Sequence, residues 1–278
     1  MRYADLHVHT FYSDSTFSPE EVARYANEKA LAAVAICDHD SIDGIELCQI
    51  EGSKFALEVI PGVELTVEKA DAEIHILGYF IDWKKRSFQS QMKRMQEFRV
   101  ERIKKMVERL KDAGIEIDAE EVFKRAGKGS IGRLHLAKEM LRQGKVKNTR
   151  EAFEKYIGFS KPCYVSKIKL SPKEAIELIL KTGGVPVLAH PTLIGTDEYI
   201  PELIKEGLRG IEVYHTDHKA SAVKHYEELA GRYGLLMTGG SDCHGMGKGR
   251  ILLGSVRVPY DLVEKLKAES EKIRHAYR

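Results

Sequence analysis

The sequence contains no hydrophobic run approaching the roughly 20 consecutive apolar residues that cross a membrane. The N-terminus turns polar almost at once, so we expect no secretory signal peptide. Cysteine is scarce, and Cys37, Cys48, Cys163 and Cys243 form no CxxC pair and no disulfide-like cluster. Internal repeats and low-complexity tracts are also lacking. These absences argue against a membrane-spanning protein or a disulfide-stapled scaffold, and we expect a reduced, cytoplasmic protein.

The charge of the chain is nearly balanced overall but unevenly distributed. The 278 residues are 43% hydrophobic and 31% charged, which suits one large α/β domain or a domain with an insertion. The net charge is only +2, yet residues 84–150 contain 20 Lys and Arg against 9 Asp and Glu, a local balance of +11, and the remainder is −9. Such a split indicates two parts with different partners, or else a solvated helical face, and charge alone does not separate these two interpretations.

Segments with strand character alternate with segments of helical character through most of the chain. Strands are expected at residues 1–8, 31–39, 57–67, 73–80, 185–191, 210–215 and 235–242, and helices at 18–30, 43–52, 171–184, 200–208 and 218–234. Two of these helices begin with Ser-Pro, at Ser18 and Ser171, a pair typical of a helix start. The repeated strand-then-helix units predict an α/β fold with a parallel sheet, either open or closed into a barrel.

The segment between the two halves, residues 84–157, contains no convincing strand. Apolar residues recur there at helical spacing, at Met92, Met95, Phe98, Ile103, Met106, Val107 and Leu110. Two or three shorter helices are expected to follow. We therefore expect a basic helical insertion at 84–157 in an α/β domain that is formed by residues 1–83 and 158–278.

Histidine, aspartate and glutamate gather at the ends of the predicted strands. In chain order the candidates are His7, His9, Asp14, His39, Glu64, His75, His190, Asp242 and His244. All but His75, which lies in mid-strand, fall near carboxyl ends of strands, where the loops of barrels and open parallel sheets converge. Each piece alone is weak, since even the HxH pair of His7 and His9 occurs by chance. Together, so many buried ionisable groups would be costly unless metal compensates them, so we predict a metal site.

The order of these blocks resembles the PHP (polymerase and histidinol phosphatase) superfamily of metal-dependent phosphoesterases. The matching stretches are DLHVHTFYSD, ICDHDSIDG, GVELT, IHILGY, VLAHP and GGSDCHG, which cover essentially the whole barrel portion. The stretch GRLHLAKEML is similar to one branch, whose members include 3′,5′-nucleotide bisphosphatases and a 5′→3′ exoribonuclease. That branch often has proline where this chain has Leu134. The resemblance implies a distorted (β/α)7 barrel, three metal ions, and a helical insertion that caps the active site.

The resemblance also implies a ligand set for each ion. His7 and His9 would bind the first with Glu64 and Asp242, Glu64 would bridge to a second that is held also by His75 and His190, and Asp14, His39 and His244 would bind the third. Imidazole and carboxylate ligands without a required thiolate favour Mn²⁺, Fe²⁺ or Zn²⁺ over Mg²⁺ or Ca²⁺, and manganese is our first choice. Closely spaced ions of this kind activate a water for attack on phosphorus, so no Ser or Cys nucleophile is needed. Glu64 and Asp242 would be central to holding that water.

Three further residues are candidates for substrate binding. Arg133 and His135 follow GKGSIG at a predicted helix start, where free N–H groups and a cation suit a phosphate, although Arg133 could be one more surface arginine. His218 follows a strand on the active face. Asp38 and Asp40 flank His39, and they either orient ligand rings or simply form the turn.

These features predict an enzyme that removes the 3′-phosphate of a nucleoside 3′,5′-bisphosphate such as pAp, or that hydrolyses short 5′-phosphorylated RNA in the 5′→3′ direction. The expected partner is that nucleotide or RNA, with no membrane and no obligate protein partner. One alternative is a small-metabolite phosphatase of the histidinol phosphatase type, against which the basic insertion argues. A second is a non-catalytic PHP module, against which the complete set of ligands argues.

Overall fold

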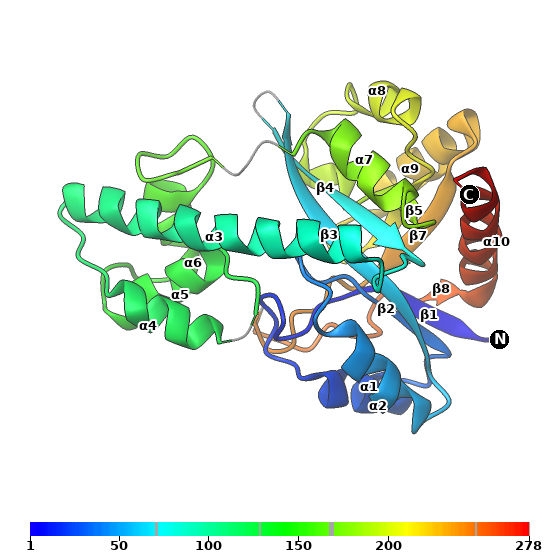
Figure 1. Ribbon diagram of the computed structural model, residues 1–278, viewed down its shortest axis with the longest axis horizontal. Helices are drawn as coiled ribbons and strands as arrows, with labels where there is room; N and C mark the ends of the chain where they lie inside the picture. The colour runs from blue at the N-terminus through cyan, green and yellow to red at the C-terminus, as the bar shows by residue number, and fades with distance from the viewer. Residues whose placement is uncertain (70–71, 128, 167–169, 248, 278) are drawn as a thin grey trace.

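A nearly closed barrel of strands, surrounded by helices, makes up most of the molecule (Figure 1). The structure is a computed structural model that describes all residues except 70–71, 128, 167–169, 248 and 278. The strands are β1 (Tyr3–Val8), β2 (Ala33–Ile36), β3 (Glu58–Lys69), β4 (Ala72–Tyr79), β5 (Val185–Leu188), β6 (Gly210–His215), β7 (Leu236–Gly240) and β8 (Val258–Pro259).

The strand order is β7-β6-β5-β4-β3-β2-β1-β8. A parallel bridge between Val8 and Cys243, just beyond β7, brings β1 and β7 together, so that seven strands nearly close while β8 pairs with β1. The predicted distorted barrel of the α/β class is confirmed. The sheet is not parallel throughout, however, because β4 runs antiparallel to both β3 and β5. Only two residues separate β3 from β4, and a parallel crossover needs a dozen or more.

Helices lie outside the barrel and extend from it on one side (Figure 1). They are α1 (Pro19–Glu28), α2 (Ile45–Ser53), α3 (Arg86–Asp112), α4 (Ala119–Ala126), α5 (Arg133–Arg142), α6 (Thr149–Ala152), a π-helix (Phe153–Ile157), α7 (Pro172–Leu180), a 3-10 helix (Pro191–Leu193), α8 (Ile200–Lys205), α9 (Ala220–Tyr233) and α10 (Tyr260–Ala276). Ser18 and Ser171 are the N-caps of α1 and α7, each in a complete capping box with proline following, as the sequence predicts.

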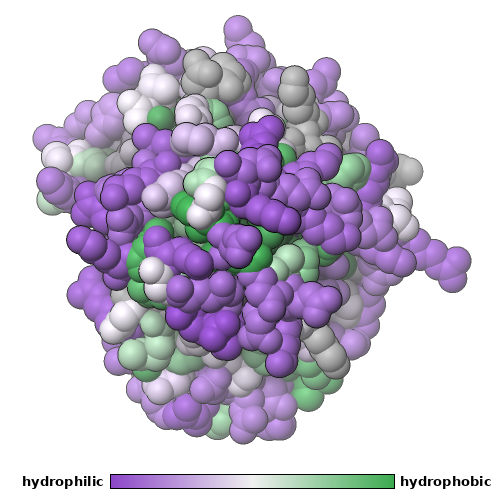
Figure 2. Space-filling model, turned by 90° about the vertical axis from the view of Figure 1, so that its left-hand side faces the viewer, coloured by the Kyte–Doolittle hydropathy of each residue, from purple (hydrophilic) through white to green (hydrophobic). Residues whose placement is uncertain are grey.

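The helix α3 contributes to two separate hydrophobic clusters. Near its start, Phe88 and Met92 pack into the barrel core, and further along Met106 and Leu110 pack with α4, α5 and the π-helix in a second cluster. Phe98 lies on α3 between these two stretches and is 38% exposed, although its spacing predicts a buried position. The helices α3 to α6 and the π-helix together form a helical region beside the barrel. Figure 2 views the molecule from the end of this region, where hydrophilic side chains cover most of the face. None of the helices in the described residues combines the length and the apolar character needed to span a membrane.

Candidate metal centre

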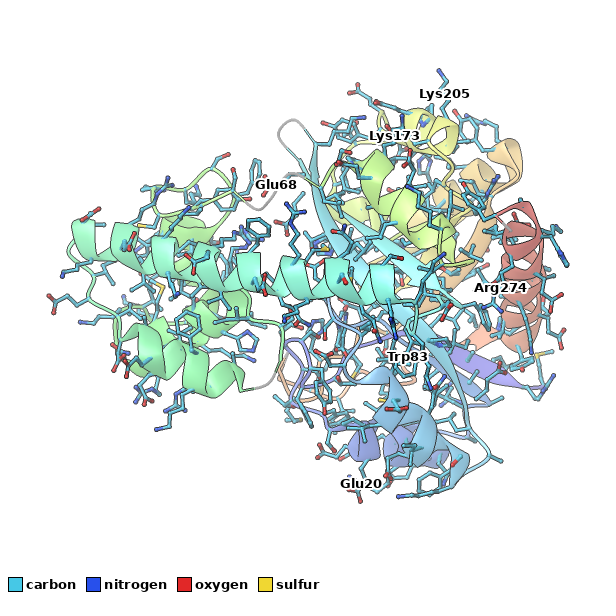
Figure 3. The ribbon with its side chains drawn as sticks, viewed as in Figure 1. Glu20, Glu68, Trp83, Lys173, Lys205 and Arg274 are labelled. Atoms are coloured by element: carbon cyan, nitrogen blue, oxygen red, sulfur yellow. The ribbon has the colours of Figure 1, made fainter. Side chains whose placement is uncertain are left out.

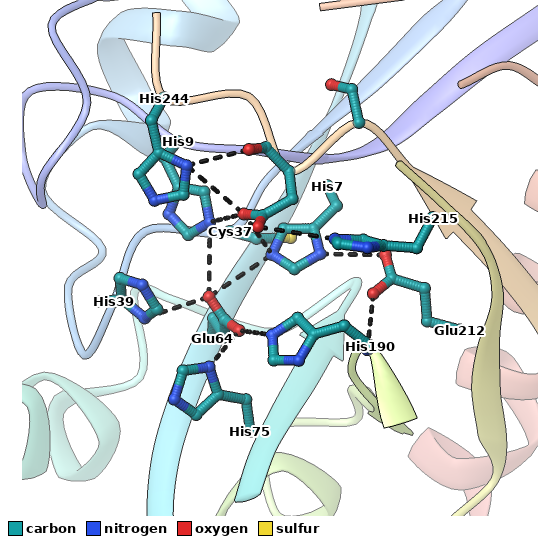
Figure 4. A network of polar contacts seen from close by, with 12 residues as sticks. His7, His9, Cys37, His39, Glu64, His75, His190, Glu212, His215 and His244 are labelled. Carbon is teal, nitrogen blue, oxygen red and sulfur yellow. Dashed lines mark hydrogen bonds and ion pairs between the residues drawn. The ribbon is translucent and has the colours of Figure 1, made fainter. Parts of the chain in front are cut away.

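Glu64 of β3 lies at the middle of a cluster of histidines at one end of the barrel (Figure 4). Its side chain is 1% exposed. Five imidazoles surround its two oxygens: Oε1 is 2.6 Å from His75 Nδ1 and 2.9 Å from His190 Nε2, while Oε2 is 3.0 Å from His39 Nδ1, 3.3 Å from His9 Nε2 and 3.4 Å from His7 Nε2. Residues at or near β1, β2, β4 and β5 therefore share one buried carboxylate of β3.

Asp242 and Asp14 extend this cluster. Asp242 Oδ1 lies 3.1 Å from His9 Nε2 and 3.5 Å from His244 Nδ1. Asp14 Oδ1 lies 3.1 Å from His244 Nε2, and its Oδ2 lies 3.9 Å from His39 Nε2. The structure thus brings all nine predicted ligands into one contiguous group. This group includes His75, which the sequence places in the middle of a strand and not at its end.

The donor atoms of this group converge on common spaces. Three sets each offer ligand atoms within 4.8 Å of one another: His9, Asp14, His39 and His244; His7, His9 and Asp242; and His39, Glu64 and His75. Within the described part of the chain, the buried Nε2 atoms of His7 and His9 and Oε2 of Glu64 make no hydrogen bond of good geometry. Buried polar atoms without partners cost free energy, and a divalent cation held between these lone pairs would remove that cost. The residues therefore fit bound metal.

The charges of the cluster favour the metal-binding forms of the three carboxylates and of His39. Burial by itself raises the pKa of Glu64, but neighbouring imidazoles outweigh it and hold that pKa well below its ordinary value. The same competition between burial and imidazoles holds the pKa values of Asp14 and Asp242 well below theirs. Burial lowers the pKa of His39 well below its ordinary value. At neutral pH the carboxylates are thus charged and this ring is neutral, which are the metal-binding forms. At His7 and His75, by contrast, neighbouring carboxylates outweigh burial and raise the pKa, for His75 to about 9.

Glu212 of β6 orients two of the predicted ligands, and the sequence interpretation missed it. It is fully buried. Its Oε1 lies 2.9 Å from His7 Nδ1, and its Oε2 accepts the backbone N–H of His190 at 2.8 Å. A carboxylate behind a metal-binding imidazole fixes the ring orientation. The signal was present, since the acidic Glu212 lies between the apolar residues Ile211 and Val213 of a predicted strand.

His215 at the end of β6 is a second residue that the sequence interpretation missed. Its buried Nε2 lies 3.5 Å from Asp242 Oδ2, and its Nδ1 accepts the backbone N–H of Asp217 at 3.2 Å. Strict alternation would place Glu212 and His215 on opposite faces of the strand. A register irregularity between Glu212 and Tyr214 changes the alternation, so that both side chains reach the cluster.

Asp38 and Asp40 serve the loops around the site. Asp38 accepts hydrogen bonds from the backbone N–H and hydroxyl of Thr10, at 2.7 and 2.6 Å, and from the hydroxyl of Ser13 at 2.6 Å. Asp40 accepts the backbone N–H of Thr66 and pairs with Arg99, whose Nη2 lies 2.5 Å from Asp40 Oδ2. Of the two interpretations left open by the sequence, these contacts favour the organisation of turns over the orientation of rings.

A cavity of about 180 Å³ adjoins the cluster and joins it to the helical region. Its lining includes Asp14, His39 and His75 from the cluster, and Arg99, Arg102, Arg133 and Phe153 from the helical region. Arg133 Nη2 lies 2.9 Å from both carboxylate oxygens of Glu73, so it is not a free surface arginine. The sequence offered a signal for Arg99 and Arg102, since they lie three residues apart within the apolar stripe of α3, and the structure shows both to be buried.

The two other predicted substrate residues are held by local contacts. His135 Nδ1 accepts the backbone N–H of Gly132 at 3.1 Å and so caps the start of α5, and burial lowers its pKa to about 4. The Nδ1 of His218 donates to the carbonyl of Val213 at 2.7 Å, and its ring centroid lies 5.3 Å from that of His215. His135 therefore lies beside Arg133, while His218 lies on the β6 side of the cluster.

A sequence model of the PHP domain matches residues 5–162, more than half of the chain. The chain belongs to the PHP family. It is 32% identical over 257 residues to the 3′,5′-nucleoside bisphosphate phosphatase of Chromobacterium violaceum, which covers 90% of each chain. It is 29% identical to a 5′-3′ exoribonuclease of Haemophilus influenzae over 86% of this chain and 89% of that one. It is 28% identical to the phosphoribosyl 1,2-cyclic phosphate 1,2-diphosphodiesterase of Eggerthella lenta over 92% of this chain and 98% of that one.

The fold agrees with this relationship. A protein from Bifidobacterium adolescentis, described as a metal-dependent phosphoesterase, superposes with a TM-score of 0.87 at 29% identity over 96% of both chains. The PHP resemblance predicted from the sequence motifs is confirmed, and with it an enzyme of the metal-dependent phosphoesterase class.

Proposed function

We propose that this PHP protein hydrolyses the 3′-phosphate of nucleoside 3′,5′-bisphosphates, short 5′-phosphorylated RNA in the 5′→3′ direction, or both. The observation that carries this proposal is the shared cavity, in which arginines lie opposite the metal-binding cluster. A bisphosphate presents one phosphate for hydrolysis and a second for recognition, and guanidinium groups bind phosphate through charge-assisted hydrogen bonds. The names of the bisphosphatase and exoribonuclease relatives support the same substrates.

We propose that the nine clustered residues hold three divalent transition-metal ions, with manganese the first choice and iron or zinc the alternatives. His7, His9, Glu64 and Asp242 would hold one, Glu64, His75 and His190 a second, and Asp14, His39 and His244 the third. When bound, such ions lower the pKa of a water and neutralise charge on the leaving oxygen. The chain's own part is to orient the ligands, through Glu212 behind His7, and to hold the substrate from the arginine side.

We also propose that residues 84–157 form an insertion capping the barrel formed by 1–83 and 158–278, in a cytoplasmic protein. Support comes from the second hydrophobic cluster, which gives the helical region a core of its own. Further support comes from Arg99, Arg102 and Arg133, which extend from it into the cavity beside the cluster. The basic charge of this segment would then have a substrate as its partner.

The test is a panel of phosphate esters assayed with manganese. The panel pairs pAp with adenosine 3′-monophosphate, which differs only in lacking the 5′-phosphate, and adds 5′-phosphorylated RNA, a ribose 1,2-cyclic phosphate and histidinol phosphate. We expect kcat/KM for pAp or 5′-phosphorylated RNA to exceed that for adenosine 3′-monophosphate by about 100-fold, the value of one strong charge-assisted contact. Equal turnover of pAp and adenosine 3′-monophosphate, or a preference for histidinol phosphate or the cyclic ester, would contradict the proposal.

A further inference from the structure

Glu73 of β4 lies between the arginine side of the cavity and the metal-binding cluster. It precedes His75 by two residues, so both side chains lie on one face of the strand. Both of its carboxylate oxygens are 2.9 Å from Arg133 Nη2, and Oε1 is 3.3 Å from His75 Nε2. The side chains are only 20% exposed for Glu73 and 15% for Arg133, so the pair is largely shielded from water.

The surroundings of this pair are cationic. The ring of Tyr164 lies near two guanidinium groups, with the Cζ of Arg102 5.1 Å and that of Arg133 5.5 Å from its centroid. Arg102 is 6% exposed, and its Nη2 has no hydrogen-bond partner among the described residues. Burial and, after it, the nearby charge of Arg133 lower the pKa of Arg102 to about 10. A nearby anion stabilises two largely buried guanidinium groups, and Glu73 is the carboxylate that contacts Arg133.

We propose that Glu73 is a specificity-determining residue that occupies, on Arg133, the place of the substrate's second phosphate. This inference rests on the proposed function, because it names what the second phosphate must displace. Carboxylate and phosphate bind arginine in the same manner, but a phosphate monoester carries about −1.5 to −2 charge at pH 7 and more acceptor oxygens than a carboxylate. A dianionic phosphate therefore displaces Glu73, whereas an ester without a second phosphate leaves the Glu73–Arg133 pair closed.

The negative charge of Glu73 also repels the second phosphate of the substrate. A carboxylate within contact distance of a phosphate site raises the free energy of the bound anion, and the ion pair must be broken before the anion binds. Removing the charge of Glu73 while keeping its shape should therefore tighten the binding of a 5′-phosphate. The neighbouring strand offers a matched control in Glu68, which is labelled in Figure 3. Glu68 stands directly across from Glu73 in the β3–β4 register, and it accepts a hydrogen bond from the hydroxyl of Tyr164 at 2.5 Å.

The experiment measures the dissociation constant of adenosine 5′-monophosphate by calorimetry with the protein as purified. Glu73→Gln should tighten binding about 10-fold, since one charged competitor is lost. Glu68→Gln removes the same charge from the facing position and should change binding less than about twofold, because the effect belongs to the contact with Arg133 and not to the general field. In an Arg133→Ala background, Glu73→Gln should give no gain. Elemental analysis of each variant reports whether the contact with His75 alters the metal content.

Unchanged or weaker binding by Glu73→Gln would overturn the inference and show that Glu73 holds Arg133 in place. A gain that persists without Arg133, or one that is matched by Glu68→Gln, would also overturn it. If Glu73→Gln does not fold, Glu73→Asp gives the same test, because the shorter carboxylate withdraws from Arg133 and should tighten binding part of the way. Failure of the proposed function is seen separately, as a lack of turnover of bisphosphate by the wild type.

Discussion

At the scale of single residues, Glu64 and Asp242 are shared among several imidazoles, so no ligand can be lost without affecting others. Glu64 lies within 3.4 Å of a nitrogen of each of five histidines, and Asp242 lies within 3.6 Å of His7, His9 and His244. In such a cluster, a few carboxylates hold most of the imidazole ligands in position.

We therefore expect Asp242→Ala and His9→Ala each to lower kcat on any phosphate ester by orders of magnitude. The reason is that activation of water depends on the metal arrangement that these side chains hold. Steady-state kinetics measures the loss, and circular dichroism checks that the fold is kept. Turnover near that of the wild type in either variant would show that the cluster is not the site of the reaction.

Arg133→Ala should lower kcat/KM on a nucleoside 3′,5′-bisphosphate by about 10- to 100-fold, the equivalent of one charge-assisted hydrogen bond. The loss on p-nitrophenyl phosphate, which has no second phosphate, should be much smaller, because contacts remote from the reacting bond favour only the substrates that make them. Equal losses on the two substrates would show that Arg133 supports the metal centre or the fold and does not bind the second phosphate.

Glu212→Gln should reduce the retention of metal with little change in the fold. The amide cannot serve both His7 and the backbone of His190 as a carboxylate does, and loss of such an orienting carboxylate typically costs about 10- to 100-fold in metal affinity. Titration with a metal-binding dye measures the affinity of the variant and of the wild type. An unchanged metal affinity would show that Glu212 does not orient the metal-binding ring of His7.

At the scale of elements, the sequence predicted each strand that carries a ligand, because apolar runs and Ser-Pro helix starts are local signals. What it could not predict depends on contacts between elements. The direction of β4 follows from the short β3–β4 connection, and the inward position of both Glu212 and His215 follows from an irregularity in β6 that the letters GIEVYH do not reveal. The ligand positions came from the gathering of His, Asp and Glu at predicted strand ends, and their assignment to separate ions came from the motif resemblance. The Glu73–Arg133 pair, in contrast, joins residues 60 positions apart and has no sequence signature.

A buried ion pair links α3 to the loop that follows β2, and its loss should destabilise the fold. Arg99 pairs with Asp40, and their side chains are 9% and 4% exposed. Arg99→Leu would leave Asp40 buried without its partner, so it should lower the free energy of unfolding by about 3–5 kcal/mol. Chemical denaturation measures this change. Arg24→Leu, which breaks the exposed pair with Glu28, is the control and should cost little. A loss for Arg99→Leu no greater than that of the control would contradict a buried role for the pair.

At the scale of the whole molecule, the uneven charge of the chain corresponds to its two hydrophobic clusters. The segment 84–150, with its balance of +11, contains most of the second cluster and supplies the arginines of the cavity, while the barrel supplies the acidic and imidazole groups opposite them. The phosphate ester in our proposal would lie between these two surfaces, with one phosphate directed to each. The account therefore requires that the barrel side hold more than one metal ion.

Elemental analysis of purified protein that has never met a chelator tests this requirement most directly. Nine clustered ligands, eight of which fall into three overlapping groups, predict more than one equivalent of transition metal per chain, and about three at full occupancy. Manganese, iron and zinc are to be measured together, so that a mixed population is counted in full. Two to three equivalents would agree with the account, and one equivalent or none would contradict it.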